Sequence, residues 1–186
     1  MNRQILCLIG SMVCYCGNAG PNLFVLICQL VTQLNGTMTL LHAYAAVIRY
    51  FVGSCMHEDA LLTYLEVKKV GVEINLCNFL LKALVDKEQL RFARGIFHDM
   101  MMCVPAPNVY TYSIMIDLYT SGDRLYMKEA YEILCEMMRK GIQPNAVTYS
   151  TYIHGLCRSG QVGPAWQFLK ELCVRECLVT LIVSIE

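Results

Sequence analysis

The stretch Val109-Tyr-Thr-Tyr-Ser-Ile-Met-Ile-Asp117 returns later in the chain as Ala146-Val-Thr-Tyr-Ser-Thr-Tyr-Ile-His154. The shared Thr-Tyr-Ser motif recurs after 37 residues, and a Pro-Asn pair (Pro107-Asn108 and Pro144-Asn145) precedes each copy. A unit that recurs at this period is typical of a solenoid, in which each repeat buries its apolar face against its neighbours.

A second recurring feature extends the pattern towards both ends of the chain. Four alanines, Ala60, Ala93, Ala130 and Ala165, follow one another at spacings of 33, 37 and 35 residues. Each alanine opens an apolar pattern with the period of a helix. Polar or glycine-containing turns separate these helices from the ones before them. The sequence therefore predicts an all-α solenoid of stacked antiparallel helix hairpins, in about four repeats (41–75, 74–108, 109–145 and 146–172).

Signals for helix ends fall at matching places in the repeats. Asp59 and Glu129 place negative charge in the first turn of a helix, where the helix dipole favours it. Gly71 and Gly141 follow lysines or arginines at the end of the same helices, which is typical of a C-cap. The prolines at 107 and 144 stop each helix from continuing, and Asn108 and Asn145 are expected to cap the next one.

Composition limits the classes of function. The 186 residues are 56% hydrophobic, and the 15 basic and 15 acidic side chains cancel, which argues against a broad electrostatic grip on nucleic acid. The eleven cysteines contain no Cys-x-x-Cys pair, and the four histidines fall singly. We therefore expect no metal site, and we interpret the cysteines as small apolar residues in helix cores in a reducing compartment.

The two ends of the chain depart from the repeat pattern. Residues 1–40 form an apolar segment whose one charged side chain is Arg3, either a degenerate repeat or a poor targeting segment. Its apolar runs are too short for a membrane span, so no membrane association is expected. Residues 173–186 form a divergent tail without the expected Gly and Pro, and its exposed apolar residues (Leu178, Val179, Leu181, Ile182) predict self-association. These ends suggest a truncated chain.

The repeats resemble the pentatricopeptide repeat family. The resemblance is specific where Thr-Tyr-Ser and Gly141-Ile-Gln-Pro-Asn145 coincide, and it covers about residues 41–172. It implies that each hairpin reads one base of single-stranded RNA. The implied base-reading residues are Asn78, Asn108, Ser113, Asn145 and Ser150, and the residues that pack against a base are Tyr110 and Val147. By the same resemblance, Ala45 and Asn75 form the first reading pair, and Thr180 closes the last repeat by count alone.

The resemblance also implies a base preference and a cellular setting. Asn78 with Asn108 should prefer a pyrimidine and Ser113 with Asn145 adenine, with the RNA running 5′ to 3′ from the N- to the C-terminus. The implied setting is RNA processing, stability or translation in a mitochondrion or chloroplast, together with other RNA-processing proteins. No cofactor and no enzymatic activity are expected, because the motifs of nucleotide-binding loops, deaminases and catalytic triads are absent.

Two alternatives stay open at this point. Asn108 and Asn145 could be plain N-caps after a proline, and the serines ordinary exposed helix residues. The chain could also be a helical-repeat scaffold that binds protein, although it lacks the Trp-Leu-Gly-Tyr pattern of tetratricopeptide repeats. The tyrosines at 112, 119, 131, 149 and 152 are expected to pack between helices.

Overall fold

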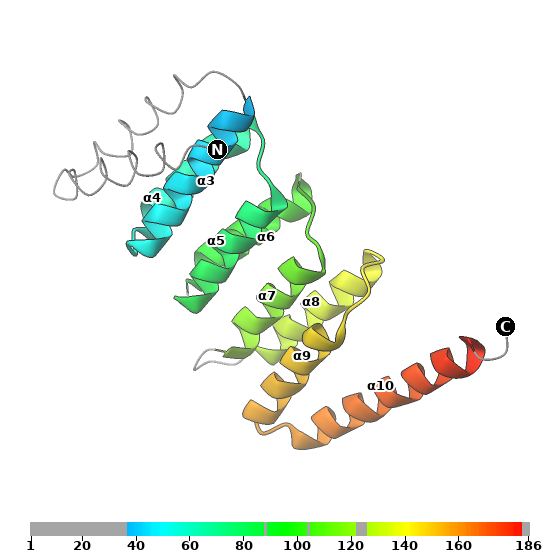
Figure 1. The fold of residues 1–186 in the computed structure, drawn as a ribbon. Coiled ribbons are helices and arrows are strands. Elements are labelled where there is room, and N and C mark those ends of the chain that lie inside the picture. Colours follow the sequence, from blue (N-terminus) through cyan, green and yellow to red (C-terminus); the bar gives the residue numbers. More distant parts are fainter. Residues whose placement is uncertain (1–36, 88, 104, 122–125, 184–186) are drawn as a thin grey trace. The chain divides into compact units, whose positions relative to one another are not determined.

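A computed structural model describes residues 37–183 except 88, 104 and 122–125, with side chains within 41–173. This part of the chain contains eight helices and no strand (Figure 1). We call α3 (Thr37–Gly53), α5 (Ile74–Asp86), α7 (Val109–Ser121) and α9 (Ala146–Arg158) the first helices. Each is followed in the chain by a second helix: α4 (His57–Val70), α6 (Leu90–Met102), α8 (Met127–Arg139) or α10 (Val162–Val183). The predicted all-α hairpin fold is confirmed.

 

The last helix, α10, continues without a break from Leu172 through residues 173–183. This agrees with the absence of Gly and Pro from the tail, because nothing in that stretch interrupts a helix. The side chains expected to drive self-association (Leu178, Val179, Leu181 and Ile182) and Thr180 lie outside the described side chains. Residues 1–36 of the N-terminal segment also lie outside the described residues. These expectations stay predictions.

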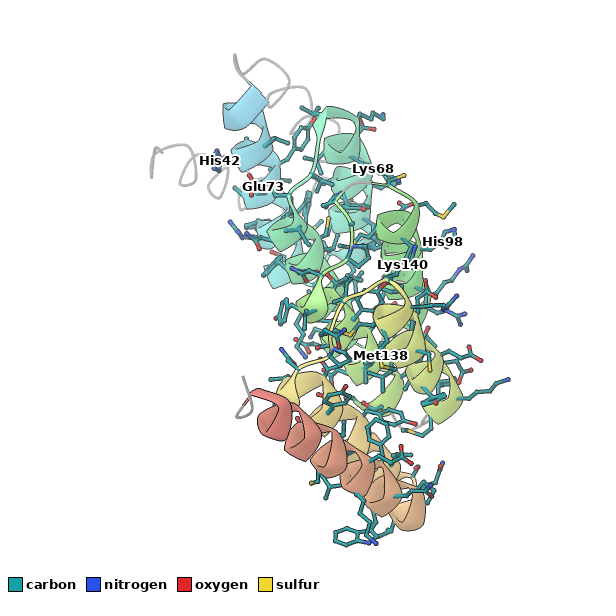
Figure 2. The ribbon with its side chains drawn as sticks, turned by 90° about the vertical axis from the view of Figure 1, so that its right-hand side faces the viewer. His42, Lys68, Glu73, His98, Met138 and Lys140 are labelled. Atoms are coloured by element: carbon teal, nitrogen blue, oxygen red, sulfur yellow. The ribbon has the colours of Figure 1, made fainter. Side chains whose placement is uncertain are left out.

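Asparagine caps and glycine turns define the helix ends, as the sequence predicts. Asn145 caps α9 in a reciprocal capping box with Thr148. At the same junction, just after α8, Gly141 has a φ of +76°, a left-handed conformation that favours glycine. The N–H of Ile142 then donates to the carbonyl of Met137 at 3.1 Å, which closes the end of α8. Lys140 and Met138 lie at this end of the helix (Figure 2).

The chain divides into two compact units. The first comprises Met1–Leu84 and Met100–Ala106, and the second Val85–Asp99 and Pro107–Glu186. In the first unit, α3 packs against α4. Ile48 and Phe51 of α3 and Ala60 and Val67 of α4 are fully buried. Ala60 is one of the four recurring alanines, and its small side chain allows the close approach of the two helices.

In the second unit, α7 packs against both α8 and α9. Tyr112 of α7 is buried and meets the Phe97 ring of α6 edge-on, with centroids 5.4 Å apart. On the other side of α9, the Phe168 ring of α10 lies 5.1 Å from the ring of Tyr152. Ala130 and Ala165 are buried as well, so the alanine pattern corresponds to helix contacts.

Close contact between repeats is also seen at Gly155 of α9. A Cβ placed at this position would lie 2.5 Å from Cγ2 of Thr120 in α7, which leaves no room for a side chain. Nearby, the Arg158 guanidinium donates to the carbonyls of Thr120 and Ser121 at 3.0 and 2.8 Å. These carbonyls belong to the last turn of α7, whose carbonyls have no partner within the helix. Gly155 and Arg158 therefore hold α9 against the end of α7.

Candidate nucleic-acid interface

The candidate base-reading residues occupy one register on three first helices. Asn78, Ser113 and Ser150 are each the fifth residue of their helix, counted from Ile74, Val109 and Ala146. Asn108 and Asn145 directly precede α7 and α9. The same position thus carries a short polar side chain in all three hairpins, asparagine in the first and serine in the other two.

Both asparagines act as N-caps. Oδ1 of Asn145 accepts from the backbone N–H and from the hydroxyl of Thr148, each at 3.0 Å. Oδ1 of Asn108 accepts from the N–H and hydroxyl of Thr111 at the same distances. The N-cap role that the sequence left open is therefore confirmed. The cap bonds of Asn145 involve its oxygen Oδ1, and its Nδ2 group takes part in none of them.

Ser113 is connected to the cap of the next repeat. Its hydroxyl lies 2.8 Å from that of Thr148 in a buried contact, and it donates to the Val109 carbonyl at 3.0 Å. Thr148 is fully buried, and Ser113 is 8% exposed. The Thr148 hydroxyl also donates to Asn145 Oδ1, so the two candidate base-reading side chains, Ser113 and Asn145, contact the same hydroxyl group. The idea that Ser113 is an ordinary exposed helix residue is wrong, because α9 covers it.

The other candidates differ in exposure. Tyr110 and Val147, the proposed base-packing residues, are 56% and 62% exposed, as a surface for a flat base requires. Ser150 is exposed and donates to the Val147 carbonyl at 3.0 Å. Asn78, in the first unit, is only 3% exposed.

The junction before α5 corrects one sequence assignment. Asn75 was expected to close a repeat, as Asn108 and Asn145 do, but it is the second residue of α5. The residue that directly precedes α5 is Glu73 (Figure 2), whose carbonyl accepts from the N–H groups of Leu76 and Cys77. Asn75 instead corresponds in register to the exposed Tyr110 and Val147. No proline precedes this helix, so the sequence lacked the signal that fixed the other two.

The tyrosine prediction is largely confirmed. Tyr112, Tyr119 and Tyr152 are buried between helices, and burial raises the pKa of each of these phenols. Tyr149 is half-buried, and its ring lies 5.9 Å from that of Phe168 in α10. Tyr131 is 49% exposed, while its ring still lies 6.1 Å from that of Tyr152. The buried phenols are therefore structural groups rather than stacking surfaces for RNA.

The cysteine prediction is correct for one residue and wrong for several. Cys77 is fully buried, and desolvation raises the pKa of its thiol to about 11. Cys55, Cys103, Cys157 and Cys173 are exposed, so they are not core residues. Among the described residues, no three His, Cys, Asp or Glu side chains gather in a way that could hold a metal ion. Within the same residues, no helix has the length and apolar character needed to span a membrane.

Models of one repeat family match three consecutive parts of the chain. A "Pentatricopeptide repeat domain" model matches residues 60–122, a "PPR repeat family" model residues 123–158, and a "PPR repeat" model residues 147–177. The matches together include the three hairpins that carry Asn78, Ser113 and Ser150.

Known proteins agree with these matches. The pentatricopeptide repeat-containing protein At5g18475 of Arabidopsis thaliana is 30% identical over 80% of this chain and 28% of its own length. The mitochondrial protein At2g26790 of the same plant is 24% identical over 76% of the chain and 17% of its own length. The chain thus spans less than a third of these relatives.

The fold has a counterpart among solved structures. The pentatricopeptide repeat protein PPR10, in complex with an 18-nt psaJ RNA element, superposes on 92% of this chain with a TM-score of 0.61. The identity is 22%, and the match covers 25% of PPR10. This similarity supports the helical-repeat fold.

Proposed function

The chain belongs to the pentatricopeptide repeat family, and from this premise we propose that it binds single-stranded RNA with sequence selectivity. The observation that carries the proposal is the pairing of Ser113 with Asn145 on Thr148, beside the exposed Val147. A polar pair beside an exposed apolar side chain has the two parts that recognition of an unstacked base needs, edge contacts and a packing surface.

The orientation of the Asn145 amide supports a particular base preference. The backbone N–H of Thr148 can only donate, so the atom of Asn145 that faces it is the oxygen Oδ1. The amide NH₂ is therefore the group left for a base. A donor from Asn145 and an acceptor from Ser113 match adenine, which offers an acceptor at N1 and a donor at N6. Guanine offers an N–H at the matching ring position and would leave two donors facing each other.

The proposed site reads few bases. The pair Asn78 with Asn108 is proposed to read a pyrimidine, and Ser113 with Asn145 the adenine that follows it. At about 1–3 kcal/mol for each stacked base, two such contacts leave binding weak. Equal numbers of acidic and basic residues add little attraction for phosphates. We expect micromolar or weaker affinity for this chain, with selectivity easier to measure than affinity.

The cellular role proposed here follows from the relatives. PPR10 was solved with RNA bound, and At2g26790 is named a mitochondrial protein. We therefore propose a role in RNA processing, stability or translation in a mitochondrion or chloroplast, by occupancy of the RNA rather than by catalysis. Other RNA-processing proteins would be its partners on the RNA.

Selection from a random pool of single-stranded RNA tests the proposal. The purified chain should enrich sequences that contain a pyrimidine followed by adenine, and a pool of double-stranded RNA should show no such enrichment. Binding without any enrichment would contradict selective recognition. If no single-stranded RNA binds while a protein partner does, the alternative of a protein-binding scaffold is favoured instead.

A further inference from the structure

The hydroxyl of Thr148 lies at the centre of a hydrogen-bond network that joins two repeats. It contacts Ser113 Oγ of the preceding first helix at 2.8 Å and Asn145 Oδ1 of its own cap at 3.0 Å. Thr148 is fully buried, so water does not compete with these bonds. The backbone N–H of Asn145 also approaches the same oxygen at 3.4 Å.

The number of protons limits how this network can be arranged. Ser113 and Thr148 carry one hydroxyl proton each. These two protons are shared among three contacts, each of which requires a hydroxyl proton: Ser113 to the Val109 carbonyl, Ser113 to Thr148, and Thr148 to Asn145. If the contact between the two hydroxyls is to hold a proton, either Thr148 donates to Ser113 or Ser113 donates to Thr148. If Ser113 donates to Thr148, the Thr148 proton is left for Asn145, and this arrangement joins both side chains through Thr148. If Thr148 donates to Ser113, the Ser113 proton goes to the Val109 carbonyl. In both arrangements Ser113 faces a base as an acceptor.

We propose that Thr148 is a specificity-determining positioning residue, which ties Ser113 and Asn145 together and fixes the acceptor and the donor that they present to one base. The inference rests on the proposed RNA-binding function. Thr148 is fully buried, so in this proposal it acts through the two side chains and not by contact with the base. Its effect is to hold both side chains in the binding geometry before RNA arrives, which lowers the cost of ordering them on binding.

The replacement Thr148→Val tests this role, because valine has the shape of threonine without the hydroxyl. The backbone N–H of residue 148 still donates to Oδ1 of the N-cap residue Asn145, so the helix start is kept. Loss of a hydrogen bond of ordinary strength predicts that the preference for adenine over guanine falls about three- to tenfold. The measurement is the ratio of dissociation constants for two short RNAs that differ only in the base read by Ser113 and Asn145.

Two further variants separate positioning from general stability. Thr148→Ser restores the hydroxyl and should restore the preference for adenine. Thr120→Val makes the same chemical change at another buried threonine of the second unit, whose hydroxyl donates to the Ile116 and Asp117 carbonyls of its own helix. It should leave the preference unchanged. Thermal unfolding of each variant checks that the fold is retained.

The outcomes distinguish this inference from the proposed function. If the unaltered chain binds no single-stranded RNA, the proposed function fails and this inference fails with it. If the chain prefers adenine and Thr148→Val keeps the full preference, the function stands and the role of Thr148 is wrong. An equal loss of preference in Thr120→Val, or no recovery in Thr148→Ser, would also overturn it.

Discussion

Asn145 shows how one side chain can serve both the fold and the proposed interface. Its carbonyl oxygen accepts from the Thr148 N–H, and its amide NH₂ is the group that we propose contacts a base. An N-cap side chain typically contributes about 1 kcal/mol to the free energy of unfolding, so the cap alone explains an asparagine at position 145. The amide NH₂ group, which the cap does not need, is what allows the second role. The two roles are compatible because an amide carries an acceptor and a donor on opposite sides.

Cys77 should differ from the exposed cysteines in reactivity. The thiolate is the reactive form, and burial raises the pKa of the Cys77 thiol to about 11, so the thiol stays protonated at pH 8. We expect a brief treatment of the folded chain with iodoacetamide at that pH to modify Cys55, Cys103, Cys157 and Cys173 and to spare Cys77. Peptide mass spectrometry measures the modification of each residue.

Treatment in denaturant is the control, since Cys77 should then react like the others. The raised pKa of Cys77 also makes the free energy of unfolding depend on pH, because the folded chain favours the protonated thiol. The folded-state pKa lies above the ordinary value of 9.0, so this contribution is present below pH 9 and is lost as the pH rises towards 11. Modification of Cys77 in the folded chain at the rate of Cys157 would contradict its burial.

The packing of α9 on α7 depends on a glycine. In Gly155→Ala, the new Cβ would lie 2.5 and 2.6 Å from two carbons of Thr120, so one helix must move. We expect a loss of about 1–3 kcal/mol in the free energy of unfolding, as for other overpacked sites. Chemical denaturation followed by circular dichroism measures it.

Gly95→Ala is the matched control for this substitution. Gly95 also lies within a helix, α6, but a Cβ there meets nothing within 4 Å. Alanine has the higher helix propensity, so this variant should gain up to about 1 kcal/mol. Two variants with the same sign and size of effect would show that α9 does not approach α7 as closely as described.

The helices could be predicted from the sequence wherever several local signals coincide. Gly141, Pro144 and Asn145 mark the junction between α8 and α9 within a few residues, and the structure has the junction there. At the start of α5 there is no proline, and the assignment of Asn75 was wrong by two residues. Local signals fix a helix boundary only where a residue forces the backbone, as proline and glycine do.

The candidate site was only partly predictable. Asn145 and Ser113 follow from the family resemblance and from their repeated positions. Thr148 was noticed only as part of the Thr-Tyr-Ser motif, because its role depends on a contact with Ser113, 35 residues earlier in the chain. The available signal was a threonine repeated at 111 and 148 on the buried side of a helix, where an apolar residue would be usual.

For the whole molecule, selective reading of RNA by paired side chains is the central claim, and Asn145→Asp tests it most directly. An aspartate still caps α9, because one carboxylate oxygen accepts from the Thr148 N–H and the helix dipole favours the charge. The other oxygen replaces the amide donor with an acceptor. It can accept from the N–H groups of guanine but cannot donate to N1 of adenine.

The measurement is the affinity of the chain and of Asn145→Asp for two short single-stranded RNAs that differ only in adenine or guanine at the base read by Ser113 and Asn145. The unaltered chain should prefer adenine, and the variant should shift towards guanine by about tenfold, the size expected for one exchanged hydrogen bond. An unchanged preference in RNA that binds both proteins would contradict the assigned reading of this base.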